Sequence, residues 1–235
     1  MLLFTLILGG CYGAYPQPPP THVTPLSTPL REGEMSLFAG TSLVTDFPEV
    51  ELNTYGGGVL MGGGVGLKED RDLYLTAGGF HGHYSAGAQL GLRNRGGERS
   101  TSGTTVGLAM TLEDGSELIG YGDNQETLET HYLSITPSIG LRWRHMANQH
   151  ISIPMNLRAS FSSVRGISSD SEVCRQALWF EAGTALSVGL RGRWQVWLGA
   201  QLMGTEYLNN GITPSDMLWY LSPNVGVTIG GSDFD

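Results

Sequence analysis

The sequence of 235 residues predicts an all-β fold, namely a closed antiparallel up-and-down transmembrane β-barrel of ten strands, with eight as the fallback count. Three observations predict it: long segments of alternating apolar and polar residues, a regular arrangement of long and short connections, and aromatic residues near strand ends. Alternation with a period of two gives a strand one apolar and one polar face. The alternating segments exceed the ~5–6 residues usual in soluble sheets and match the ~9–11 residues with which a tilted strand crosses a bilayer.

Composition narrows the class of protein. Glycine is abundant at 35 residues, charged residues make up 15%, and no apolar run approaches the length of a transmembrane helix. A net charge of −9 argues against nucleic acid as a partner. Nine of the 13 basic residues fall near the turns expected in the periplasm: Lys68, Arg71, Arg93, Arg95, Arg99, Arg142, Arg144, Arg191 and Arg193.

The amino terminus is predicted to be a signal peptide, residues 1–11, followed by a proline-rich linker, residues 12–33. The apolar run ends in Leu8-Gly9-Gly10-Cys11, which resembles a bacterial lipobox and implies that Cys11 is lipidated, as in a lipoprotein. An ordinary signal peptide with a chance cysteine is the alternative. Cys174 would be unpaired, because a bridge to Cys11 would join opposite ends of the barrel.

Residues 34–235 are expected to form the barrel. The strands of the carboxyl half alternate most regularly, at 133–143, 151–161, 178–190, 194–203 and 217–229. The weaker candidates of the amino half are about 35–44, 56–67, 72–81, 83–93 and 103–112. The external connections are then 45–55, 82, 113–128, 164–176 and 208–216, and the periplasmic ones 68–71, 94–102, 144–149 and 191–193. Short periplasmic turns and longer external loops are typical of outer-membrane barrels.

Aromatic residues on the apolar parity support this placement. Trp143 and Trp194 lie near the predicted periplasmic turns, and Phe180, Trp219 and Tyr207 lie near the external ends. Two aromatic girdles flanking an apolar band are expected where rings meet lipid headgroups. A soluble sandwich with an aromatic core is the alternative, but it would not need runs of this length.

In this pattern residues 34–235 resemble the small outer-membrane barrels of the OmpA/OmpX type. Their last strand carries an assembly signal ending in an aromatic residue, which Gly226-Val227-Thr228-Ile229 resembles in part, with Phe234 penultimate. The resemblance implies localisation in the outer membrane of a Gram-negative bacterium. It implies outer-membrane lipid and the barrel-assembly machinery as partners; an external ligand is not identified.

The inward parity predicts a polar core in the narrow lumen, made of Arg142, Arg158, Glu181, Gln195 and Gln201. The register set by the 164–176 connection places Arg158 opposite Glu181, and Arg142 lower, near the periplasmic mouth. A structural plug is the preferred interpretation, and a narrow charged filter for small ions is the alternative.

Signals for catalysis or for a cofactor are weak. His83-Tyr84-Ser85 resembles the His-x-Ser segment of outer-membrane lipid A deacylases, which implies a base and a nucleophile. Parity, however, places both side chains in the lumen, away from lipid. His81 and His83 are too few for a metal site, and the acidic loop 113–128 has no calcium-loop spacing. No catalytic residue, metal or cofactor is therefore predicted.

The sequence thus predicts a non-catalytic outer-membrane barrel with a structural or surface-interaction role through its external loops. A narrow pore for small solutes or ions is the first alternative. A lipid-modifying enzyme and a soluble periplasmic β-domain on a lipid anchor are weaker ones.

Overall fold

The computed structural model describes residues 29–47, 54–68, 70–80, 83–97, 99–119, 126–166, 174–190, 193–208 and 217–230. These residues form ten strands and no helix that could cross a membrane. The strands are β1 (Met35–Phe47), β2 (Thr54–Lys68), β3 (Arg71–Phe80), β4 (His83–Gly96), β5 (Ser100–Ile119), β6 (Glu126–Asn148), β7 (Ile151–Gly166), β8 (Cys174–Gly189), β9 (Trp194–Tyr207) and β10 (Leu218–Gly230).

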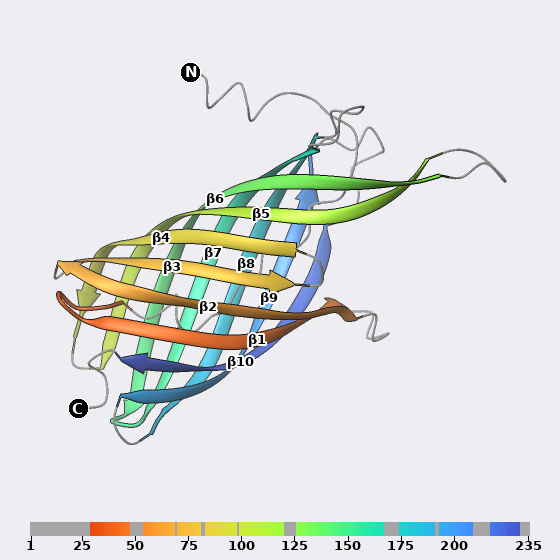
Figure 1. Ribbon diagram of the computed structural model, residues 1–235. Coiled ribbons are helices and arrows are strands. Elements are labelled where there is room, and N and C mark those ends of the chain that lie inside the picture. The colour runs from red at the N-terminus through yellow and green to blue at the C-terminus, as the bar shows by residue number, and fades with distance from the viewer. Residues whose placement is uncertain are drawn as a thin grey trace.

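The ten strands close into one barrel (Figure 1). Each strand pairs antiparallel with its neighbours in sequence, and β1 closes the barrel against β10. The predicted count of ten is confirmed and the fallback of eight is wrong, because β3 and β4 are separate strands paired from Asp72 with Gly91 to Phe80 with His83. Closure leaves no unpaired sheet edge in the wall, as a bilayer requires.

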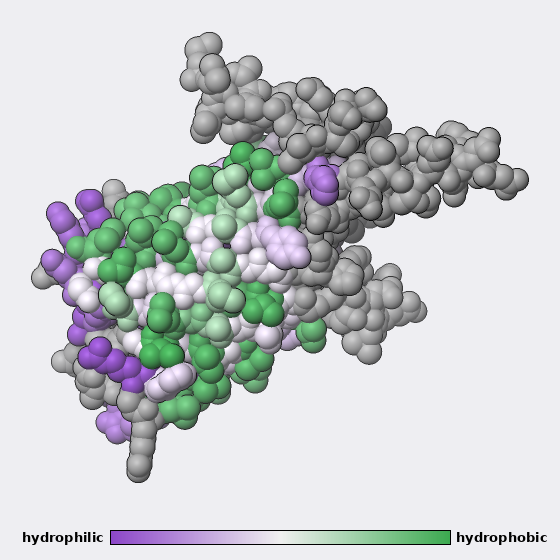
Figure 2. All heavy atoms as spheres, viewed as in Figure 1, coloured by the Kyte–Doolittle hydropathy of each residue, from purple (hydrophilic) through white to green (hydrophobic). Residues whose placement is uncertain are grey.

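The outer face of the barrel is apolar and the inner face is polar. Figure 2 shows hydrophobic residues interspersed with near-neutral ones over the visible part of the barrel wall, and hydrophilic residues gathered at one end. On β6, Ile135, Ile139 and Leu141 are exposed outward, while Tyr132 and Arg142 are buried inside. The expectation that the apolar parity faces hydrocarbon is therefore confirmed. An apolar exterior on a closed barrel is the architecture with which chains span the bacterial outer membrane, and the protein is a transmembrane β-barrel of that membrane.

The two ends of the barrel differ in the length of their connections. At one end the strands meet in tight turns, for example between Lys68 and Arg71 and between Asn148 and Ile151. Because periplasmic turns are short, this end is the periplasmic one. The first residue of β1 and the last of β10 lie at the same end, and Trp194 is exposed on the outer face there. Trp219 and Phe180, near the external end, are also exposed outward.

The strands β5 and β6 continue past the external rim as a two-stranded ribbon (Figure 1). Among the described residues, the last pair with β4 is Glu113 with His83, and the last pair with β7 is Tyr132 with Gly166. Beyond these, six further pairs join residues 114–119 of β5 to residues 126–131 of β6. The expected loop at 113–128 is therefore wrong in extent, because backbone pairing continues although polar residues break the alternation.

Candidate functional site

The lumen holds the predicted polar core. Arg142, Glu181, Gln195 and Gln201 are buried, and Arg158 is largely buried. Each side chain lies on the inward parity of its strand, opposite the apolar outer face. They are not evenly spread: Arg142 belongs to one network, and Arg158, Glu181 and Gln201 belong to a second.

The central network joins β7, β8 and β9. Arg158 lies directly opposite Glu181 in the register, as expected. Its Nε donates to Oε1 of Glu181 at 2.9 Å and its Nη2 donates to Oε2 at 2.6 Å, a bidentate ion pair. The side-chain amide of Gln201 also donates to Oε2 of Glu181. All three groups are thereby paired inside the wall, which limits the cost of removing their charges and dipoles from water.

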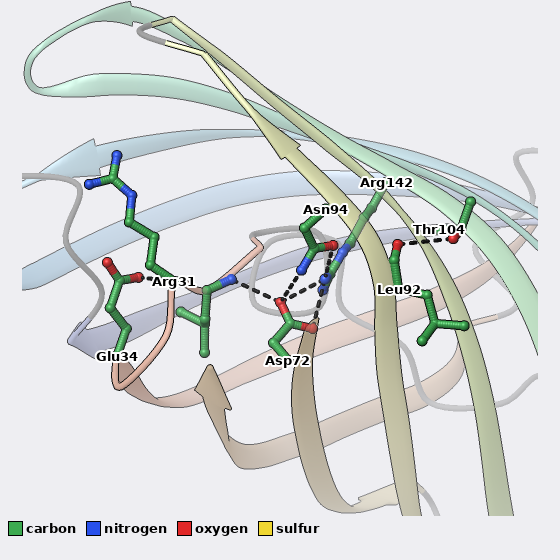
Figure 3. Close-up of polar contacts among 8 residues, drawn as sticks. Arg31, Glu34, Asp72, Leu92, Asn94, Thr104 and Arg142 are labelled. Carbon is green, nitrogen blue, oxygen red and sulfur yellow. Dashed lines mark hydrogen bonds and ion pairs between the residues drawn. The ribbon is translucent and has the colours of Figure 1, made fainter. Parts of the chain in front are cut away.

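The periplasmic network is centred on Asp72 of β3 (Figure 3). Arg142 of β6 donates through Nη2 to both carboxylate oxygens of Asp72, at 2.7 and 2.6 Å. It also donates to Oδ1 of Asn94 at 2.8 Å, and Nδ2 of Asn94 donates to Asp72 at 3.3 Å. The backbone N–H of Leu30 completes the set with a bond to Oδ2 of Asp72 at 2.8 Å. Asp72 is 0% exposed and Arg142 1% exposed, so this charge pair is fully withdrawn from solvent.

Two glycines make room for this network on the strands between β3 and β6. A Cβ atom at Gly91 of β4 would lie 1.9 Å from Nη2 of Arg142 and 2.1 Å from Oδ1 of Asp72. At Gly103 of β5 it would lie 2.2 Å from Oδ1 of Asn94. Because real Cβ contacts are not this short, any larger residue would push the network apart. Close approach of a side chain is one reason for glycine inside a strand.

The external part of the lumen is lined by large apolar and aromatic side chains. Ala177, Trp179, Met203 and Tyr220 form one buried cluster. Lower down, Trp197 donates from Nε1 to Oγ1 of Thr228 at 3.2 Å. The lumen thus carries bulky groups from β8, β9 and β10 at several depths.

Some of the other residues singled out from the sequence lie in the lumen, and the rest lie in parts of the chain that the structure does not describe. Gln195 accepts a bond from the Ser187 hydroxyl at 3.3 Å, apart from both networks. Ser85 lines a cavity inside the barrel, where a bilayer lipid does not reach it. Cys11, the linker up to residue 28, and the side chains of His83 and of the acidic residues at 113–128 lie outside what the structure describes. Within the described residues, no group of three potential metal ligands occurs.

Sequence reasoning missed three members of the periplasmic network: Asp72, Asn94 and Leu30. Asp72 lies on the inward parity of its strand. A buried carboxylate is costly unless it is paired, so its position signals a basic partner on the inner wall. Gly91 and Gly103, on the two strands between Asp72 and Arg142, are the further signal for a side chain crossing there. Leu30 left no such signal, because it belongs to the segment expected to be a linker.

Comparison with known proteins finds similarity in fold but none in sequence family. No protein-family model and no curated protein matches the sequence. Among solved structures, the outer membrane protease OmpT from Escherichia coli is 8% identical with a TM-score of 0.45, over 84% of this chain and 95% of that one. The translocator domain of the autotransporter NalP from Neisseria meningitidis is 14% identical with a TM-score of 0.48, over 85% and 89%. Ail, the attachment invasion locus protein of Yersinia pestis, is 11% identical with a TM-score of 0.38, over 85% and 99%.

Proposed function

We propose that the protein is a non-catalytic, non-conducting outer-membrane barrel that presents the β5–β6 ribbon to a partner outside the cell. The observation that carries the proposal is the ribbon itself, which continues for six residue pairs beyond the neighbouring strands. The two buried networks in the lumen support the non-conducting part, because their ion pairs are withdrawn from solvent, with Asp72 and Glu181 side chains 0% exposed.

The ribbon offers two kinds of contact. Within the described residues, the pairing of β5 with β4 ends at Glu113 and the pairing of β6 with β7 ends at Tyr132, so an added strand can pair alongside the ribbon.

The sequence of the ribbon is also acidic. Residues 113–130 contain no lysine or arginine and carry six acids: Glu113, Asp114, Glu117, Asp123, Glu126 and Glu129. A negative surface attracts a positively charged partner and speeds its approach. The ribbon therefore fits an extended, basic polypeptide.

Removing the ribbon tests this role. A variant in which Asn-Gly replaces residues 114–131 joins Glu113 to Tyr132, which are already paired, through a tight hairpin turn. We expect it to remain a folded barrel with heat-dependent gel mobility, and to lose binding of fluorescent polylysine to neutral phosphatidylcholine vesicles that carry the protein. The matched control, Asp170→Asn with Glu172→Gln, neutralises acids in another external connection and should retain binding. Equal binding by the ribbonless variant and the parent would contradict the proposal.

Planar-bilayer recording separates this function from the pore alternative. We expect the purified protein to give no discrete conductance steps, because charged side chains of the inner wall are buried in ion pairs at two depths, Arg158 with Glu181 and Arg142 with Asp72. Reproducible single-channel steps in neutral lipid would instead favour a pore for small solutes or ions. The ribbonless variant serves as the control, since the external ribbon should not alter the lumen.

A further inference from the structure

A groove crosses the lipid-facing wall of the barrel, with residues of β5 to β10 in its lining. Its volume is about 540 Å³, which is within the range of ~300–1,000 Å³ of small-molecule sites. The large side chains of its lining are apolar and lie on the outward parity: Ile139, Leu141, Leu157, Phe180, Leu202 and Trp219. The groove is therefore open to the hydrocarbon of the bilayer and not to the lumen.

Two alanines account for the hollow. Ala159 of β7 lies opposite Phe180 of β8 in the register, and Ala182 of β8 lies opposite Leu157 of β7. Each large side chain thus faces a methyl group across the strand pair. Because opposite Cβ atoms are only ~4.5–5.5 Å apart, a short side chain beside a tall one leaves a depression in the surface. The groove is therefore built by the choice of residues at these four positions.

Trp219 bounds the groove toward the external end of the barrel. It lies opposite Gly204 of β9 in the register. A Cβ atom at Gly204 would lie 2.9 Å from Cζ3 of the Trp219 ring, so the glycine lets the indole lie back over β9 against the wall. From this ring, near the depth of the lipid headgroups, the groove leads to Thr104 in the periplasmic half of β5.

We propose that this groove is a binding site for one acyl chain of an outer-membrane lipid, whose headgroup lies at the external interface beside Trp219. The site is continuous with the apolar wall that already faces hydrocarbon, so the bilayer itself supplies the occupant. The lining recognises the chain and not the headgroup. The inference goes beyond the proposed function, because it concerns the lipid-facing wall and not the ribbon.

The polar groups near the groove are already paired, which fits a hydrocarbon occupant. Thr104 shares the outward parity of Val106 and donates its hydroxyl to the carbonyl of Leu92 at 3.0 Å. Arg158 and Glu181, at the same place in the wall, are bonded to each other on the inner face. A polar headgroup in the groove would leave its own hydrogen bonds unmade, which is costly. An alkyl chain needs none.

Close packing, and not the hydrophobic effect, would hold the chain in place. Lipid chains are as apolar as the wall, so moving a chain from bulk lipid into the groove buries no new surface from water. A concave surface, however, contacts a chain on several sides, whereas the convex wall elsewhere contacts it on one. The dispersion energy of these additional contacts favours the groove over other positions around the barrel.

Photo-crosslinking in bilayers tests for this site. The full-length protein is placed in phosphatidylcholine vesicles that contain a trace of phosphatidylcholine with a diazirine halfway along one acyl chain. Mass spectrometry of the attached peptides should show several-fold more labelling of β7 and β8 than of β2 and β3, which lie on the opposite side of the barrel (Figure 1). Even labelling around the wall of the parent protein would overturn the proposal.

A pair of variants ties the labelling to the groove. Ala182→Trp fills the hollow and should abolish the excess on β7 and β8. The matched control, Ala77→Trp, places the same ring at an exposed alanine of β3 and should leave the excess unchanged. Heat-dependent gel mobility checks that both variants are folded. An excess that persists in folded Ala182→Trp would contradict the assignment to this groove.

Mass spectrometry of the intact protein, extracted from outer membranes in mild detergent, separates the lipid from a second copy of the barrel. We expect a monomer that retains one lipid molecule, with the lipid lost in Ala182→Trp and kept in Ala77→Trp. A lipid-free dimer that Ala182→Trp converts to monomers would mean that a second copy fills the groove. That result, or a parent monomer without lipid, would overturn the proposal.

Discussion

Asp72→Ala is expected to lower the free energy of unfolding by about 3–5 kcal/mol, because it leaves the guanidinium of Arg142 buried without its counter-charge. Arg142 is 1% exposed, so water cannot replace the carboxylate. The substitution also removes the acceptor of the Leu30 N–H. The effect should appear in urea titrations of the protein in lipid vesicles, followed by tryptophan fluorescence.

Asp70→Ala is the matched control for this result. Asp70 lies two residues earlier, at the turn, with its side chain 54% exposed and an ion pair to Arg71 at 3.7 Å. Exposed pairs of this kind contribute ~0–1 kcal/mol, so the unfolding curve should hardly move. If Asp70→Ala and Asp72→Ala shift the midpoint equally, the buried network does not stabilise the barrel.

A second variant disturbs the same network without removing a charge. Gly91→Ala should also destabilise the barrel, because its Cβ would overlap both Arg142 and Asp72. Gly97→Ala places a Cβ no closer than 3.6 Å to any neighbouring atom, the Ser100 oxygen, and serves as its control. Agreement between Gly91→Ala and Asp72→Ala would assign the loss to the ion pair and not to a general defect of β3.

The fold was predictable from the sequence in strands whose residues follow a single rule, the alternation of lipid-facing and lumen-facing side chains. Each strand from β6 to β10 faces lipid on one side and the lumen on the other, so apolar and polar residues alternate strictly along it. Odd and even positions therefore identified the inner and outer residues. The same alternation, with the connection between β7 and β8, placed Arg158 opposite Glu181. In β2, the three glycines at positions 62–64 have no side chains and so show no apolar–polar alternation, and the bounds of this strand were less clear from the sequence.

The periplasmic network depends on contacts that no local rule reveals. Asp72 and Arg142 are 70 residues apart, with two strands between them in the wall. Only the curvature of a closed barrel brings their side chains together across those strands. Leu30 is similar, because its burial depends on a turn that is fastened to Gly66 of β2. The ribbon was missed for a different reason, since a strand outside the bilayer needs no apolar face.

Glu181→Ala is the second large effect, with an expected loss of about 3–5 kcal/mol, because Arg158 loses a bidentate partner and Gln201 an acceptor. Glu206→Ala, an exposed acid on β9, is the matched control and should change stability little. Replacing both members of the pair, Arg158→Met with Glu181→Met, should cost less than Glu181→Ala, since no buried charge is left unpaired. A melting curve and urea midpoint unchanged by Glu181→Ala would mean that lipid-facing packing and backbone pairing alone set the stability of the barrel.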